Sequence, residues 1–205
     1  MVSQQHNLDT IANNLANVNT TAFKQQKAQF QDLVYQTFRA SGASNGSGST
    51  PQAAQIGLGS RFASSSTSFA LGTFQPSADP LHMAINGDGF FQVTLPDGTA
   101  AYTRDGSFAI DSAGQVVSSD GYLLEPSIVI AAGAAQVSIS QTGVVSAQLP
   151  GQNDVTEVGT IQLATFPNPS GLTRLGKNLY SQSAGSGTPT PGTPGSQGIG
   201  TINQF

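Results

Sequence analysis

The chain contains no cysteine, and this absence excludes two kinds of site. Without thiols there is neither a disulfide framework nor a thiolate metal centre. The absence is compatible with an oxidising compartment but does not identify one. No apolar run approaches the roughly 18 residues that a membrane-spanning helix needs. The first residues also lack the charged and apolar regions that are typical of a cleaved signal peptide.

Charge is scarce as well, because charged residues make up only 9% of the 205 residues, against about a quarter in an average globular protein. The net charge is −4, and the basic residues are scattered along the chain as Lys24, Lys27, Arg39, Arg61, Arg104, Arg174 and Lys177. Such scattering offers no electrostatic footprint for nucleic acid and no polybasic patch for a membrane surface. We therefore expect no nucleic-acid partner and no membrane insertion.

The chain is instead rich in small and uncharged polar residues: glycine, serine, threonine, asparagine and glutamine. This composition is typical of β-structure with many turns. It also suits surfaces that pack against copies of themselves, since like charges would otherwise repel one another at every repeated contact.

From Leu81 to Phe166, short apolar alternations are separated by turn sequences, which is the all-β pattern. Phe91, Val93 and Leu95 alternate before Pro96-Asp97-Gly98, where proline and glycine supply the backbone angles of a turn. Further strands are predicted around Phe108–Ile110, Val116–Val117, Tyr122–Leu124, Ile128–Ile130, Val137–Ile139, Val144–Val145 and Ile161–Leu163. The predicted fold class is mainly β: a domain of short antiparallel strands, preceded by an N-terminal helix and an extended linker region.

The pattern divides the chain into four regions. They are a helical segment over residues 1–21, an extended connector over residues 22–75, a β-rich domain over residues 76–182 and a Gly/Pro-rich return segment over residues 183–205. Within the connector, residues 22–38 fit a helix or an extended chain equally well. Ser41–Gln55 has no apolar period and predicts a flexible loop, after which a strand resumes near Ile56.

The helical segment carries the most informative pattern. Its apolar residues lie at i, i+3, i+7 and i+10, at Leu8, Ile11, Leu15 and Val18. This is the narrow seam of a coiled coil, which needs a partner helix. We expect a helix over residues 3–18, which would be marginal in isolation.

Asparagines are poor helix formers, so local propensity does not explain Asn13, Asn14 and Asn17. They are either a solvated helix face or amide groups that hydrogen-bond to neighbouring helices. In the second case they would fix the register of assembly, as an asparagine in a coiled-coil seam does.

Motifs for catalysis are weak. The Asp-Gly pairs at Asp88, Asp97, Asp105 and Asp120 are read as turns, because Asp-Gly is common hairpin chemistry and no calcium-loop spacing accompanies them. The two histidines, His6 and His82, lack a zinc-binding partner at helical spacing. Since no Ser-His-Asp set and no phosphate loop can be assembled, we predict no catalytic, cofactor or metal site.

Four ordered blocks closely resemble the bacterial flagellar rod and hook family. They are Leu8–Lys24 (LDTIANNLANVNTTAFK), Asp79–Val93 (DPLHMAINGDGFFQV), Tyr102–Phe108 (YTRDGSF) and the segments between Phe166 and Tyr180 (FPNP, GL and GKNLY). Together they span almost the whole chain. The resemblance implies a structural protein, in which the N-terminal helix packs with a C-terminal helix in the core of a tubular polymer and the β-rich domain forms the outer wall.

The segment Phe30–Arg39 and the loop after it are similar to the distal-rod branch of this family, where an insertion is linked to a straight, stiff tube. The insertion here is Ala40 to Leu58, and the residues expected to set rod stiffness are Ala40, Ser41, Gly42, Gly46, Gly48, Pro51 and Leu58. The residues expected in the subunit-contact helix are Leu8, Ile11, Asn13, Asn14, Leu15, Asn17 and Val18. Family members extend further at both ends, so we expect truncated polymerisation helices and a monomeric fragment.

By the same resemblance, the partners would be copies of this chain, the proximal rod proteins, the hook, and the outer ring proteins that act as a bushing. The subunit would lie in the periplasm-spanning basal body and would leave the cytosol through the flagellar export apparatus, without a cleaved signal. A proximal rod or hook-type subunit is the nearest alternative.

Two alternatives come from other functional classes. An extracellular β-domain that binds carbohydrate or a surface ligand would need clustered aromatics such as Tyr35, Tyr102, Tyr122 and Tyr180, although the chain has no tryptophan. A wall hydrolase ranks third, because no acid/base pair can be nominated.

Overall fold

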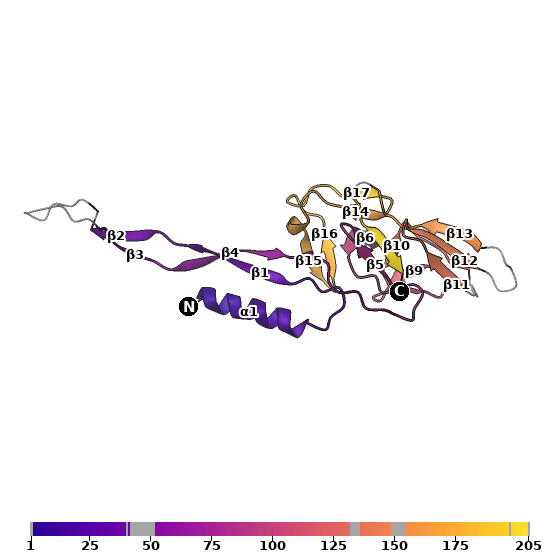
Figure 1. Ribbon diagram of the computed structural model, residues 1–205, viewed down its shortest axis with the longest axis horizontal. Helices are drawn as coiled ribbons and strands as arrows, with labels where there is room; N and C mark the ends of the chain where they lie inside the picture. The colour runs from indigo at the N-terminus through magenta and orange to yellow at the C-terminus, as the bar shows by residue number, and fades with distance from the viewer. Residues whose placement is uncertain are drawn as a thin grey trace, which may run out of the picture. The chain divides into compact units, whose positions relative to one another are not determined.

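The computed structural model describes residues 2–39, 41, 52–131, 136–148, 155–196 and 198–204. The chain divides into two compact units (Figure 1). The first, which we call the hairpin unit, comprises Met1–Thr20 and Gln25–Ser68; the second, the β-domain, comprises Thr21–Lys24 and Phe69–Phe205. The chain therefore passes from one unit to the other at residues 20/21, 24/25 and 68/69.

The hairpin unit contains one helix and a long antiparallel ribbon among its described residues (Figure 1). These elements are α1 (Val2–Ala16), β1 (Gln26–Asp32), β2 (Tyr35–Arg39), β3 (Ala54–Gly57) and β4 (Ser60–Thr67). β1 pairs with β4 and β2 pairs with β3. The connector that the sequence left undecided is thus extended from Gln26 onward.

Helix α1 ends at Ala16, two residues before the predicted end. The amide of Val18 donates to the carbonyl of Leu15 at 3.2 Å, a bond to the third preceding residue that tightens the last turn. Asn17 and Val18 therefore continue the helical face only as part of a turn. α1 falls short of both the length and the hydropathy that a bilayer-spanning helix requires.

The β-domain is built from short strands whose pairings are all antiparallel. The strands are β5 (Met83–Asn86), β6 (Phe90–Thr94), β7 (Ala100–Thr103), β8 (Phe108–Ile110), β9 (Val116–Ser118), β10 (Leu123–Glu125), β11 (Gln136–Ile139), β12 (Val144–Gln148), β13 (Val155–Thr160), β14 (Leu163–Thr165), β15 (Thr173–Gly176), β16 (Leu179–Ser181), β17 (Thr190–Gly192) and β18 (Thr201–Gln204). A single turn of 3₁₀ helix, η1 (Pro169–Gly171), precedes β15 in this part of the chain. The predicted mainly-β fold class is confirmed.

The main sheet runs in the order β15-β16-β7-β6-β10-β9-β8, and β14 joins it by pairing with β6 and with β17. Beside it, β11, β12 and β13 form a second sheet, and β18 pairs with β5. Strands near the C-terminus thereby close onto strands near residue 85: Ile202 lies opposite Ile85 and is fully buried.

One predicted strand is wrong. Ile128–Ile130 makes only an isolated bridge, between Val129 and Gln115, although Ile128 and Ile130 are both buried. The alternation of buried and exposed side chains was read correctly. Among the described residues, however, the backbone of this segment bonds only to the turn at Gly114 and to the first residue of β9: the amide of Ile130 donates to the carbonyl of Gly114, and the carbonyl of Ile128 accepts from the amide of Val116.

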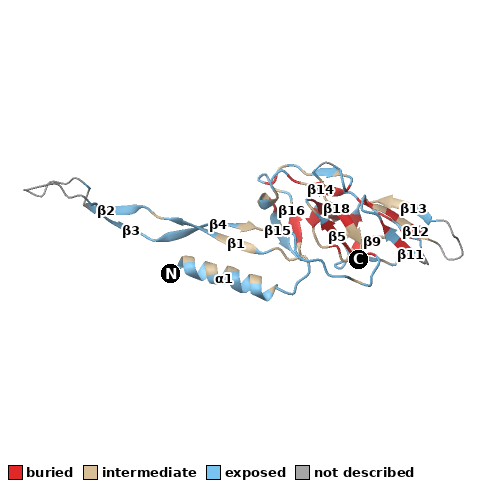
Figure 2. Cartoon of the chain, in the orientation of Figure 1, coloured by how far each residue is buried: buried red, intermediate tan, exposed pale blue. Residues whose placement is uncertain are grey.

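Two clusters of buried side chains lie on opposite faces of the main sheet, because successive side chains of a strand point to opposite sides. Phe91 belongs to the larger aliphatic cluster and meets Phe108 edge-on at 5.2 Å. Its neighbour Phe90 belongs to a smaller aromatic cluster, with Tyr102, Phe166 and Tyr180. Figure 2 shows that the buried residues are concentrated in the strands of this domain.

The close approach of Gly106 to β5 yields a stability prediction. A Cβ at Gly106 would lie 1.6 Å from the carbonyl oxygen of Met83. Because this oxygen belongs to the backbone, a change of side-chain rotamer cannot remove the clash. We expect Gly106→Ala to destabilise the β-domain by about 3 kcal/mol or more. By calorimetry or circular dichroism, this should appear as a fall in melting temperature of roughly 6 °C or more.

Gly72→Ala is the matched control, because a Cβ there meets nothing within 4 Å. It should leave the melting temperature nearly unchanged. Equal melting temperatures for the two variants would contradict the packing described here.

Candidate assembly surfaces

Helix α1 presents its apolar residues to solvent. Leu8, Ile11 and Leu15 are 66%, 53% and 70% exposed, and Val18 in the following turn is 71% exposed. No described residue of α1 is buried, as Figure 2 shows. The four residues predicted to form a coiled-coil seam thus lie on one uncovered surface, which we call the apolar stripe. Exposed apolar surface of this kind is stabilised when a partner removes it from water.

A second stripe runs beside the first and is polar. Its members are the half-buried residues of the helix and of the turn that follows it: Ser3, Asn7, Thr10, Asn14 and Asn17. They repeat at intervals of four and three, so they share one face of the helix. Each of the last four precedes an apolar-stripe residue by one position. α1 contacts β1 and β4, and the Ser3 hydroxyl donates to the carbonyl of Ser60 in β4. The sequence pattern did not reveal this second stripe.

Asn14 is the best-defined contact of the polar stripe. Its amide nitrogen donates to the carbonyl of Gln26 at 2.8 Å, and its amide oxygen accepts from the Gln26 amide at 3.0 Å. The side chain thus pairs with β1 as a neighbouring strand would. This intramolecular use is neither of the two readings considered from the sequence. Contact of Asn14 with a neighbouring subunit stays a prediction.

Asn17 and Asn13 lie at the end of the helix. The Asn17 amide donates to the carbonyl of Asn13 at 2.9 Å, and the Thr20 hydroxyl donates to the Asn17 side-chain oxygen at 3.2 Å. The first bond reaches a backbone carbonyl of the last helical turn, where carbonyls lack partners within the helix, and the second joins two side chains of the turn that follows. Asn13 has an exposed side chain, so it is available to a partner.

The ribbon of the hairpin unit carries a further apolar surface. The register places Gln36 opposite Ile56, and the amide of Leu58 donates to the carbonyl of Val34. Val34, Ile56 and Leu58 therefore share one face, and they are 79%, 60% and 61% exposed. Of the predicted stiffness residues, Leu58 lies on this face and Ser41 lies in a turn. Ala40, Gly42, Gly46, Gly48 and Pro51 lie outside the described residues.

Two of the four aspartates of the Asp-Gly pairs, Asp97 and Asp105, hold turns, while Asp88 and Asp120 face Arg104 and Lys177. Asp97 accepts from both the amide and the hydroxyl of Thr99, and these bonds lower the pKa of Asp97 below its usual value. Asp105 accepts from the amide of Ser107 in the same way. Gly98 and Gly121 have positive φ angles, as such turns require. Within the described ranges, no group of three or more His, Asp or Glu side chains is placed to hold a metal ion.

Ser77, Asp79 and His82 do come together, in a loop. The Ser77 hydroxyl lies 2.6 Å from His82 Nδ1, and His82 Nε2 lies 3.6 Å from a carboxylate oxygen of Asp79. The Ser77 oxygen also accepts from the Asp79 amide, and His82 bridges to Ser107. All three side chains lie within six residues, and Asp79 is largely exposed. The arrangement closes a loop and does not resemble a nucleophile held in a cleft.

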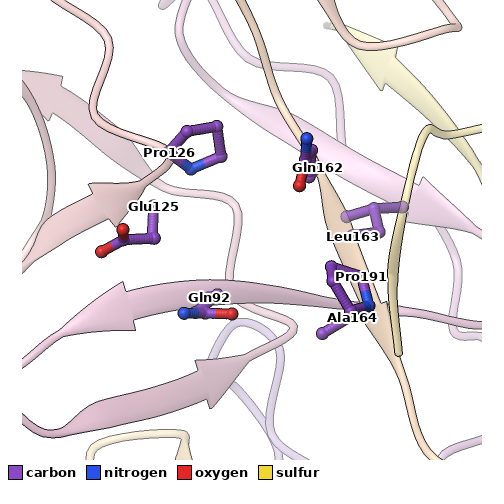
Figure 3. Close-up of a pocket in the computed structure, with 7 residues that line it drawn as sticks. All are labelled: Gln92, Glu125, Pro126, Gln162, Leu163, Ala164 and Pro191. Atoms are coloured by element: carbon purple, nitrogen blue, oxygen red, sulfur yellow. The ribbon is translucent and has the colours of Figure 1, made fainter. Parts of the chain in front are cut away.

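A shallow depression of about 240 Å³ lies where β6, β10 and β14 meet (Figure 3). It is lined by Gln92, Glu125, Pro126, Gln162, Leu163, Ala164 and Pro191. Glu125 is the one ionisable side chain of this lining, and its carboxylate accepts from the Thr94 hydroxyl at 2.7 Å. The lining offers neither an acid/base pair nor an aromatic platform for a sugar, so the depression lends no support to either the hydrolase or the carbohydrate alternative.

Comparison with known proteins identifies two matching family descriptions. "Flagella basal body rod protein" matches residues 1–24, and "Flagellar hook protein FlgE/F/G D1 domain" matches residues 84–147. The first covers α1 with both of its stripes, and the second covers most of the strands of the β-domain.

Flagellar basal-body rod proteins are among the relatives that align with the whole chain. The flagellar basal-body rod protein FlgG of Borreliella burgdorferi is 44% identical over 207 residues, covering 100% of this chain and 78% of the relative. The protein of the same name from Bacillus subtilis is 37% identical, covering 98% of this chain and 78% of the relative. A flagellar hook protein FlgE from Helicobacter mustelae is also 37% identical, but it aligns with only 61% of this chain and 28% of its own length.

The pairing of Asn14 with β1 yields a prediction for the hairpin unit. Asn14→Ala removes two hydrogen bonds worth about 1 kcal/mol each, partly offset by the better helix propensity of alanine. We expect the amides of α1 to exchange with solvent about fivefold to tenfold faster, as measured by hydrogen exchange.

Asn13→Ala is the control, because it makes the same substitution at an exposed neighbour. It should slow exchange slightly through helix propensity. Faster exchange in both variants would show that the pairing with Gln26 does not hold the helix.

Proposed function

The chain belongs to the family of flagellar basal-body rod proteins, and we propose that it is the subunit of the distal part of the rod. Many copies would stack into a rigid helical tube that transmits motor torque to the hook. The role is mechanical rather than catalytic. The support comes from relatives named as rod proteins that match the whole chain, whereas the hook relative matches only part of it.

The observation that carries this proposal is the uncovered apolar stripe of α1. The polar stripe beside it is already used by the hairpin unit, through Asn14 and Ser3. The apolar stripe is left for helices of neighbouring copies. A tube grows when such contacts are repeated without closing into a ring.

The exposed apolar face of the ribbon gives a second place for neighbouring copies to meet. We propose the segment Ala40 to Leu58 as the stiffness element; Ile56 and Leu58 of this face belong to it, and Val34 lies just before it in sequence. Contacts on the ribbon would add to those of the helices. A subunit held at two separated surfaces resists bending more than one held at a single surface.

The remaining partners follow from the place of such a subunit in the basal body. They are the proximal rod proteins below it, the hook above it, and the outer ring proteins around it. We propose that the subunit spans the periplasm and reaches it through the flagellar export apparatus. The low surface charge is compatible with close packing against many identical neighbours.

The apolar stripe yields a direct test in the full-length protein. Ile11→Ser with Leu15→Ser should remove roughly 3 kcal/mol of apolar burial from each subunit contact, which corresponds to about a hundredfold weaker association. We expect rods to be absent by electron microscopy and motility to be lost. The melting of the β-domain should stay unchanged.

The matched control places serine at Ala12 and Ala16, which are exposed positions outside both stripes. Rods should then form normally. Normal rods in the stripe variant, or loss of rods in the control, would count against the apolar stripe as the assembly surface.

The stiffness element is tested by deletion. Removing Ala40 to Leu58 should give curved, hook-like polymers. Because this deletion also removes β3, the partner of β2, a shorter deletion of residues 42–50 separates the two effects. Straight rods of normal stiffness after both deletions would dismiss the proposal.

A further inference from the structure

Three of the seven basic residues converge in the β-domain, although they are scattered in the sequence. Arg104 lies over the rings of Phe90 and Phe69, with its guanidinium carbon 5.0 and 5.8 Å from their centroids. Arg174 lies 5.8 Å over the rings of both Phe23 and Tyr180. Lys24 is close enough to Arg104 for the two charges to repel each other. Such cation–aromatic contacts are stronger when water is excluded.

The three cations donate to backbone carbonyls of the segments where the chain enters and leaves the β-domain. Arg174 donates to the carbonyl of Lys24. Lys24 Nζ donates to the carbonyl of Ala70 at 2.9 Å, and Arg104 donates to that of Phe69 at 3.0 Å. The second terminal nitrogen of Arg104 reaches the carbonyl of Gly87 at 3.1 Å. Hydrogen bonds from a charged donor are about twice as strong as neutral ones.

The side-chain amide of Asn178 makes a similar contact with the connector. Asn178 donates to the carbonyl of Thr21 at 2.9 Å from a tight turn, in which Lys177 and Asn178 have φ angles of 52° and 58°. Positive φ is unusual for residues other than glycine, although asparagine tolerates it best. The turn thereby aims the Asn178 amide at the connector segment, while Lys177 points to Asp120 at the surface.

The arrangement is costly in electrostatic terms. The Arg104 side chain is only 8% exposed, and its nearest carboxylate, on Asp88, is 3.8 Å away and 90% exposed. Burial lowers the pKa of Arg104. Burial and the charge of Arg104 together lower the pKa of Lys24. The Arg104 Nε has no hydrogen-bond partner among the described residues. Cations placed only for solubility would lie in water, so their burial indicates a specific task.

We propose that Lys24, Arg104, Arg174 and Asn178 form a carbonyl clamp that fixes the connector segments Thr21–Lys24 and Phe69–Ala70 on the β-domain. This inference rests on the proposed function in one respect, because the clamp would carry torque into the β-domain at the points where the chain enters and leaves it. The clamp holds backbone atoms rather than side chains. A force on the connector is therefore transmitted through these hydrogen bonds to the sheet whose strands carry Arg104 and Asn178 at their ends.

Limited proteolysis of this chain tests the clamp without reference to rods. Trypsin cleaves after Lys24 only when the connector is released, and the rate follows the population of the released state. Asn178→Gly removes the amide while glycine keeps the positive φ of the turn. Arg174→Lys keeps the charge but changes the donor geometry. Both should raise cleavage at Lys24–Gln25 by about tenfold, which corresponds to the loss of one hydrogen bond to the connector.

Lys177→Gly is the matched control, because it makes the same change at the adjacent positive-φ position of the turn without touching the clamp. It should change cleavage by less than about twofold. The clamp is refuted if Asn178→Gly and Arg174→Lys are cleaved like the unmodified chain, or if Lys177→Gly accelerates cleavage equally. Circular dichroism melting establishes that each variant is folded.

The mechanical part is tested separately in the full-length protein. Rods built from the Asn178→Gly subunit should assemble normally, but swimming speed should fall more steeply with viscosity than it does with Lys177→Gly. Normal swimming at high viscosity, together with faster proteolysis, would overturn the transfer of torque and leave the rod assignment intact. Failure of the unmodified full-length protein to form rods would instead overturn the proposed function.

Discussion

The β-domain depends on one constraint, which is that strand β6 is buried on both faces. Phe90 and Phe91 are adjacent, so their rings must point to opposite sides of the sheet, and both are almost completely buried. One face needs the aliphatic cluster and the other needs the aromatic cluster of Tyr102, Phe166 and Tyr180. Phe69 extends the second cluster by meeting Phe90 and Tyr180 edge-on. The aromatic cluster in turn provides rings for both arginines of the clamp: Arg104 lies over Phe90 and Phe69, and Arg174 lies over Tyr180.

The hairpin unit is organised differently, because no residue of its helix is fully buried. The two stripes of this helix differ in their contacts. In the polar stripe, Ser3 and Asn14 bond to the ribbon of the same unit, whereas the side chains of the apolar stripe are exposed. Hydrogen bonds from Asn14 to a backbone are directional and set the orientation of the helix on β1. Apolar contacts are non-directional and suit the strong, repeated association of subunits. Under the proposed function, local folding and assembly would use different chemistry on neighbouring faces of the same helix.

Much of this organisation could be predicted from residue patterns. The seam of Leu8, Ile11 and Leu15 indicated an uncovered helix face, and alternation between turns indicated short antiparallel strands. Other features could not be predicted, since they join residues far apart in sequence. No pattern near Asn14 indicates that Gln26 is its partner. Arg104 and Arg174 are 70 positions apart in sequence, and only the pairing of strands in the sheet brings them close together. Residues 22–38 were ambiguous because β1 and β2 form a ribbon with both faces largely exposed, which gives no clear alternation. Ile128–Ile130 shows the opposite case, because its side chains alternate although its backbone makes only an isolated bridge.

The burial of Arg104 has a consequence for the environments in which this subunit works. Ions in solution weaken exposed charge pairs over a distance of about 8 Å at physiological ionic strength, yet they do not enter the space between Arg104 and the carbonyl of Phe69. The few exposed charges of the chain contribute little to its cohesion. The hold of Arg104 on the backbone at Phe69 should therefore change little between dilute fresh water and concentrated brine, which makes this part of the subunit indifferent to salinity.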